Sequence, residues 1–70
     1  MSWRYYETGI ESPEVLGSGS SFSNVVKTTS EDEAFQAYRM GGRNYLWRVT
    51  LDTEASRKVE QWNTEQERFR

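Results

Sequence analysis

Three arginines in the middle of the sequence form its most concentrated source of positive charge. Arg39 and Arg43 flank the pair Gly41-Gly42, and Arg48 follows shortly after. Arginine forks bind phosphate, and glycine lets the backbone approach an anion closely. The same pattern also fits the C-terminal end of a helix, where basic side chains offset the helix dipole. No Walker or dinucleotide-binding motif accompanies the arginines, so both interpretations stay open.

Aromatic side chains are the second group that could recognise a partner. The chain has three Trp, four Tyr and three Phe, and Trp3, Tyr5 and Tyr6 lie on one short segment. Successive side chains of a strand point to opposite faces, so some of these rings should face away from the covering helices. Aromatic residues and arginine dominate binding hot spots. The residues expected to contact a partner are therefore Trp3, Tyr5, Tyr6, Arg39, Arg43 and Arg48.

Acidic residues gather at Glu31, Asp32 and Glu33, with Glu7, Glu11 and Glu14 earlier in the chain. Such a cluster could mimic nucleic-acid phosphates or dock on the basic groove of a partner. It also suits the first turn of a helix, where carboxylates face the positive end of the dipole.

Several kinds of chemistry are excluded by composition. The sequence has no Cys and no His, which removes disulfides, thiolate ligands, the commonest metal ligand and the usual general base. No pair of carboxylates has a distinctive spacing, and a chain of 70 residues leaves little room for a pocket that excludes water. We therefore expect no catalytic residues, no metal and no cofactor.

Charge and hydropathy narrow the expected partners and location. The formal net charge is −2, whereas nucleic-acid binders usually carry a large basic patch. No apolar run approaches the ~20 residues that span a bilayer, and residues 1–7 lack the apolar region of a signal peptide. These features predict a soluble, cytoplasmic protein with no membrane partner.

The elements expected to position these groups alternate between strands and helices. Aromatic and β-branched alternation predicts strands over 3–8, 22–29 and 45–51, with Gly9 ending the first. The Gly/Ser segment 17–21 is expected to be a flexible loop. If the strands on either side of the first helix are neighbours, they should be parallel.

Two helices are expected. Ser30 and Glu33 form a capping-box pattern for a helix that runs to about Met40 and ends at Gly41-Gly42. A second helix is expected from Asp52 or Thr53 to the C-terminus, with Ala55, Val59, Trp62 and Phe69 as its apolar stripe. The predicted fold is a single α+β domain over 1–70, with a three-stranded sheet and both helices on one face, in the order β-β-α-β-α.

Four short segments also resemble the order of elements in ADP-ribosyltransferase domains. They are Trp3-Arg4-Tyr5, Ser12 to Leu16, Val26 to Ser30 before a helix, and Tyr45 to Val49. In that family an arginine on an early strand and a Ser-Thr-Ser-like strand end shape the NAD site. The resemblance implies that role for Arg4 and for Thr28 to Ser30. The chain is shorter than the catalytic core of that family and has no later strand to carry the catalytic glutamate.

Together these features predict a non-enzymatic module that binds a protein partner through aromatic and charged residues. An inhibitor of the phage- or plasmid-encoded kind fits this size and composition. A homodimer is also expected to be favourable, because a small chain has a thin core. The alternative function is nucleic-acid binding through the three arginines, and a truncated ADP-ribosyltransferase-like domain is the remote alternative.

Overall fold

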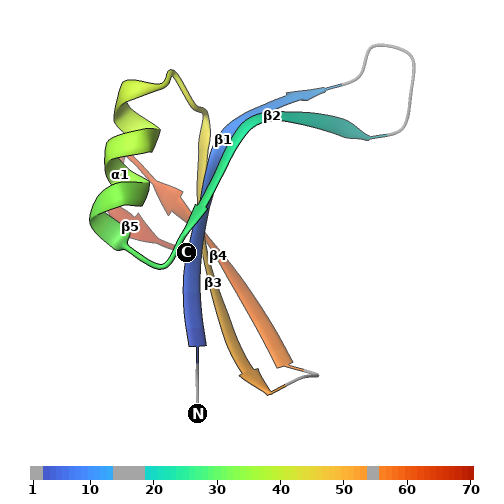
Figure 1. Cartoon of the computed structure of the whole chain (residues 1–70), viewed down its shortest axis with the longest axis vertical. Coiled ribbons are helices and arrows are strands. Elements are labelled where there is room, and N and C mark those ends of the chain that lie inside the picture. The colour runs from blue at the N-terminus through green and yellow to red at the C-terminus, as the bar shows by residue number, and fades with distance from the viewer. Residues whose placement is uncertain (1–2, 14–18, 54–55) are drawn as a thin grey trace.

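The computed structural model describes residues 3–13, 19–53 and 56–70. Five strands form one sheet, and one helix lies across one of its faces (Figure 1). In chain order the elements are β1 (Trp3–Pro13), β2 (Ser20–Thr28), α1 (Glu31–Met40), β3 (Tyr45–Thr53), β4 (Ser56–Asn63) and β5 (Arg68–Phe69). The strand order across the sheet is β2-β1-β3-β4-β5, and every neighbouring pair is antiparallel.

The expected three-stranded sheet with two helices is therefore wrong, because the C-terminal segment forms strands. In β4, Arg57, Val59 and Gln61 alternate with Lys58, Glu60 and Trp62, and the two sets face opposite sides of the sheet. Val59 and Trp62, which the predicted helix would place on one stripe, therefore face opposite sides of the sheet. Ala55 of that stripe lies outside the described residues.

A tight turn then brings β5 back against β4. The Asn63 side-chain oxygen accepts a hydrogen bond from the Gln66 backbone N–H at 2.9 Å, and Glu67 has a φ of 52°. The reversal pairs Trp62 with Phe69, so the two apolar residues expected on one helix lie on adjacent strands.

β1 continues through Gly9, where the sequence predicts a break. Gly9 pairs with Tyr45 of β3, and a Cβ at this position would lie 2.8 Å from the Tyr45 hydroxyl oxygen and 3.1 Å from the Ser23 carbonyl oxygen. Glycine therefore allows close packing within the strand rather than ending it. β1 also separates β2 from β3, so those two strands run parallel without being neighbours, and the condition stated for a direct parallel pair is not met.

The helix α1 confirms the predicted start and end. Ser30 is the N-cap, and its hydroxyl accepts the Glu33 backbone N–H at 3.3 Å. The reciprocal half of the capping box differs: the Glu33 carboxylate accepts from the Thr28 hydroxyl at 3.0 Å, and that hydroxyl in turn accepts the Ser30 backbone N–H. The helix stops at Gly41, and Gly42 adopts the left-handed φ of 64°.

The core lies between α1 and the sheet. Tyr6, Ala34 and Leu46 are buried there, and α1, β4 and β5 pack four more side chains against them: Phe35, Tyr38, Trp62 and Phe69. The rings of Phe35, Trp62 and Phe69 meet edge to face, with centroids 4.8–6.1 Å apart. Aromatic rings thus supply most of this core, because the chain has few aliphatic side chains to fill it.

The far ends of β1 and β2 form a hairpin arm that extends beyond the helix-covered part of the sheet (Figure 1). Residues 10–13 pair there with residues 20–23. Ser20 and Ser21 belong to β2 rather than to the predicted loop 17–21, whose residues 17–18 lie outside the described part. Within the described residues, no helix has the length and apolar character required to cross a bilayer.

Candidate functional site

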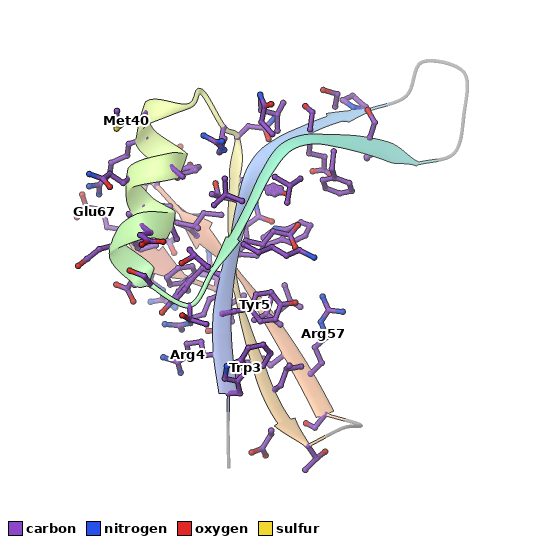
Figure 2. All side chains as sticks on the ribbon, in the orientation of Figure 1. Trp3, Arg4, Tyr5, Met40, Arg57 and Glu67 are labelled. Atoms are coloured by element: carbon purple, nitrogen blue, oxygen red, sulfur yellow. The ribbon has the colours of Figure 1, made fainter. Side chains whose placement is uncertain are left out.

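The face of the sheet opposite α1, called the open face below, carries a row of aromatic and aliphatic side chains. Figure 2 shows Trp3, Tyr5 and Arg57 on this side, whereas Arg4 projects toward the helix side. Strand pairing places further residues beside them, because directly paired residues share a face. The open face includes Trp3, Tyr5, Glu7, Glu11, Phe22, Lys27, Tyr45, Trp47, Val49, Leu51, Arg57, Val59 and Gln61.

One end of the open face is closed by three rings. Tyr45 and Trp47 stack with centroids 4.4 Å apart and planes 16° from parallel. Phe22, from β2, meets both rings edge-on at 5.6 and 5.8 Å. Tyr45 is buried by this packing, whereas Phe22 remains 47% exposed. The packing of the three rings holds Tyr45 and Trp47 against the sheet and leaves the Phe22 ring accessible to a partner.

The other end of the open face contains a groove. Trp3 and Tyr5 lie with ring centroids 5.4 Å apart and planes tilted by 43°. With Leu51 of β3 and with Lys27, Thr28 and Thr29 at the end of β2, they line a depression of about 520 Å³. Trp3 is 55% exposed. The groove therefore offers apolar ring surface and one ammonium group to a ligand.

The charges of this face are unevenly distributed. The Glu7 carboxylate accepts a hydrogen bond from the Tyr45 hydroxyl at 2.9 Å and lies 3.9 Å from the Lys27 ammonium. Burial and this carboxylate raise the pKa of Tyr45 to about 12. Lys27 remains 66% exposed at its side chain, and Arg57, which pairs with Leu51, is also exposed. The groove is thus flanked by accessible cations, and the Glu7 carboxylate beside Lys27 is already engaged by the Tyr45 hydroxyl.

Trp3 and Tyr5 lie together on the open face, as the proposed partner contacts require. Tyr6 does not join them, because it points to the helix side, where it is only 4% exposed. Its hydroxyl donates to the Glu31 carboxylate at 2.8 Å, and its ring packs 6.1 Å from that of Phe69. Burial and Glu31 raise the pKa of Tyr6. The expectation that Tyr6 contacts a partner is therefore corrected: it is a core residue.

The three arginines do not form one site. Arg39 lies over the Phe35 ring at 5.3 Å. Arg43 donates to the carbonyl oxygens of Asn24 at 2.9 Å and Ala37 at 2.8 Å. It thus satisfies a carbonyl at the helix end, as the helix-terminus interpretation predicts.

Arg48 is held on the helix side by Glu60. Two hydrogen bonds of 3.1 and 2.9 Å join the guanidinium to the carboxylate, and the guanidinium also lies 4.4 Å from the Phe69 ring centroid. These bonds raise the pKa of Arg48 and lower that of Glu60. The sequence also allowed an anion site at Gly41-Gly42. The arginine that follows this pair, Arg43, instead donates its hydrogen bonds to backbone carbonyls.

Comparison with protein families, with curated proteins and with solved structures finds no match. Nor do the described residues contain a group of three acidic side chains placed to hold a metal ion. The function of the chain therefore has to be argued from its own geometry.

The positions singled out by the ADP-ribosyltransferase resemblance do not line a common groove, because Arg4 is absent from the groove that Thr28 and Thr29 border. Arg4 projects to the helix side of the sheet (Figure 2). Thr28 and Ser30 hold the start of α1 through their hydroxyls, while Thr28 and Thr29 also border the groove. They do not converge with Arg4 on one cavity.

Of the open-face residues, sequence reasoning identified only Trp3 and Tyr5 as contacts; those it missed include Phe22, Lys27, Trp47, Leu51 and Arg57. The alternation of residues 45–51 does place Trp47 and Leu51 on the same face as Tyr45. It does not reveal that this face lacks a covering helix. Arg57 was missed because its segment was assigned to a helix.

Proposed function

We propose that this chain is a non-catalytic module that binds a protein partner through the open face of its sheet. The observation that carries the proposal is the exposure of Trp3 and Phe22 on that face, at 55% and 47%. Large exposed rings on one surface favour a binding site, because contiguous apolar patches are unfavourable on an isolated protein.

The surface beneath these rings is rigid enough to present them. Val49 is fully buried in the middle of the open face and Tyr45 is only 3% exposed. Backbone pairing on both sides of β3 holds these residues in place. A preordered surface loses little conformational entropy on binding, which favours affinity.

The polar groups support binding rather than catalysis. Among the described residues, no buried side-chain nitrogen or oxygen lacks a hydrogen-bond partner. The hydroxyls of Tyr6 and Tyr45 donate hydrogen bonds to the carboxylates of Glu31 and Glu7, and the Arg48 guanidinium donates to the Glu60 carboxylate. Each of these groups already has a structural role, whereas Trp3, Phe22, Lys27 and Arg57 remain accessible on the open face.

Nucleic-acid binding through the predicted arginines is less favoured by this arrangement. Arg43 and Arg48 are bonded internally, and the open face carries Glu7 and Glu11 as well as Lys27 and Arg57. A single strand requires a continuous cationic track beside its stacked bases. Titration with a single-stranded oligonucleotide at low salt, where phosphate contacts are strongest, tests this alternative directly.

The proposal is tested by comparing two surface variants as bait for partner capture. Trp3→Ser removes the most exposed ring of the open face, and Met40→Ser removes an 81% exposed side chain at the end of α1. Both variants should melt close to the wild-type temperature, since neither residue is in the core. We expect Trp3→Ser to lose a captured protein that wild type and Met40→Ser both retain.

Equal capture by all three proteins would contradict the proposal. Loss of capture by Met40→Ser alone would place the interface on the helix side. Light scattering of the free protein is measured in parallel, because a dimer that Trp3→Ser converts to monomer would mean that the open face binds a second copy instead.

A further inference from the structure

We infer that the groove at Trp3 and Tyr5 receives an apolar side chain from an extended, acidic segment of the partner. This inference rests on the proposed function and names the chemistry of the partner at the same surface.

The walls of the groove specify the apolar part. Trp3, Tyr5 and Leu51 contribute ring and aliphatic surface, and the tilt of 43° between the two rings opens a wedge rather than a flat stack. A volume of about 520 Å³ accommodates one large side chain together with its flanking backbone. Anchors of this kind dominate interface energetics when they fill a desolvated pocket.

The cations specify the charge of the flanking residues. Lys27 borders the groove on the β2 side, and Arg57 stands beyond Leu51 on the β4 side. The Lys27 side chain is 66% exposed. Its ammonium lies 3.9 Å from the Glu7 carboxylate, a separation at the upper limit for an ion pair. Arg57 is exposed, and its guanidinium points away from the helix side of the sheet (Figure 2). Both cations are therefore accessible to carboxylates of a partner.

Their separation sets the length of the segment. Lys27 is level with Glu7 of β1, whereas Arg57 is level with Leu51 and so with Trp3. Three strand spacings and this offset along the strands give a diagonal of about 20 Å. An extended peptide covers that distance in about six residues. Carboxylates near both ends of such a segment, with the apolar anchor between them, match the groove and its two cations.

The test uses a blocked octapeptide that has two acidic residues at each end and four central residues, of which two are leucine and phenylalanine. Two control peptides carry lysines in place of the acids, or serines in place of the two apolar residues. Binding to the ¹⁵N-labelled chain is followed by the amide shifts. We expect the acidic-apolar peptide to shift residues around Trp3, Lys27, Leu51 and Arg57, and both control peptides to bind more weakly.

Variants of the cations sharpen this test. Lys27→Gln and Arg57→Gln should each weaken peptide binding by about two- to fivefold, as expected for exposed ion pairs. Arg70→Gln, which removes an exposed cation at the far end of the chain, should leave it unchanged. Raising the salt concentration should weaken binding of the wild type more than that of the double variant of Lys27 and Arg57.

Three results would overturn the inference. They are no amide shifts at millimolar peptide, equal binding of the lysine peptide, and tighter binding of a single-stranded octathymidylate than of the acidic peptide. If the peptide causes no amide shifts but Trp3→Ser still abolishes partner capture, the open face binds a protein of other chemistry. In that case only this inference fails. If capture is also unaffected by Trp3→Ser, the proposed function fails with it.

Discussion

Trp3 and Tyr6 lie on the same strand, β1, yet they face opposite sides of the sheet. Trp3 is 55% exposed on the open face, whereas Tyr6 is 4% exposed beneath α1. Two aromatic residues three positions apart therefore have different roles, one available to a partner and the other part of the core. The alternation of side chains along a strand produces this separation.

Substitution of Tyr6 should accordingly affect the fold rather than binding. Tyr6→Ala removes a buried ring and should lower the free energy of unfolding by about 3–5 kcal/mol. Tyr6→Phe keeps the ring and loses only the hydrogen bond to Glu31, with an expected decrease of about 1 kcal/mol. Urea denaturation measures both values. A Tyr6→Ala protein as stable as the wild type would show that this ring is not part of the core.

Glu60 should stabilise the fold only while it is ionised. Its hydrogen bonds with Arg48 lower its pKa from 4.5. The carboxylate of Glu60 therefore binds a proton less readily in the native state than in the unfolded state. This contribution is present above about pH 4.5 and is lost as the pH falls through the lowered native-state pKa. We expect Glu60→Gln to lower the free energy of unfolding at pH 7 by about 1–3 kcal/mol.

The acid range distinguishes this pair from general charge effects. The difference between wild type and Glu60→Gln should shrink as the pH falls from 5 to 3, because protonation removes the same interaction from the wild type. The matched control is Glu65→Gln, which changes an exposed glutamate in the turn between β4 and β5. A difference between wild type and Glu60→Gln that is constant over this range would contradict the assignment.

Tyr45 should make the protein sensitive to alkali. Its pKa is raised from 10.0 to about 12 by burial and by the Glu7 carboxylate, so the native state retains this proton after the unfolded state has lost it. The contribution is complete below pH 10 and is lost as the pH rises through about 12. The free energy of unfolding should therefore fall over this interval, and it should fall less steeply in Tyr45→Phe. Identical slopes in the two proteins would contradict the burial of this hydroxyl.

Gly9 and Tyr45 should be energetically coupled. A Cβ at Gly9 would lie 2.8 Å from the Tyr45 hydroxyl oxygen, so Gly9→Ala should destabilise the protein by about 1–3 kcal/mol through overpacking. The same substitution should be less harmful in a Tyr45→Phe background, because the hydroxyl is absent there. A double-mutant cycle based on urea denaturation measures this coupling. Additive effects would show that the hydroxyl does not limit the space at Gly9.

The parts of the fold that could be predicted are those encoded by neighbouring residues. Ser30 and Gly42 define the ends of α1 through capping and a left-handed turn, and the alternation from Tyr45 to Leu51 defines β3. These signals depend only on residues close together in the sequence, so they can be recognised without knowledge of the tertiary structure.

The C-terminal half of the sheet could not be predicted in the same way. The spacing of Val59, Trp62 and Phe69 fits the period of a helix, yet Val59 lies on the open face and the other two lie on the core side of the sheet. The choice is made by partners distant in sequence: Val59 pairs with Val49, and Glu60 bonds Arg48 across the sheet. Such pairings depend on register, which local propensity does not specify.

The candidate site was predictable only in part for a similar reason. Alternation separates Trp3 and Tyr5 from Tyr6 but does not identify which set the helix covers. Both faces of β1 carry aromatic rings, so hydropathy gives no preference. Once the C-terminal segment is known to form strands rather than a helix, Arg57 joins the open face and Trp62 joins the core.

The location of the interface can be tested most directly by hydroxyl-radical footprinting of the free protein and of the protein bound to its captured partner. Trp3, Phe22 and Met40 are exposed and readily oxidised, and they report on the groove, the aromatic cluster and the helix end. The open-face account predicts that the partner protects Trp3 and Phe22 and leaves oxidation of Met40 unchanged. Protection of Met40 with unchanged oxidation of Trp3 would place the partner on the helix side and contradict the account.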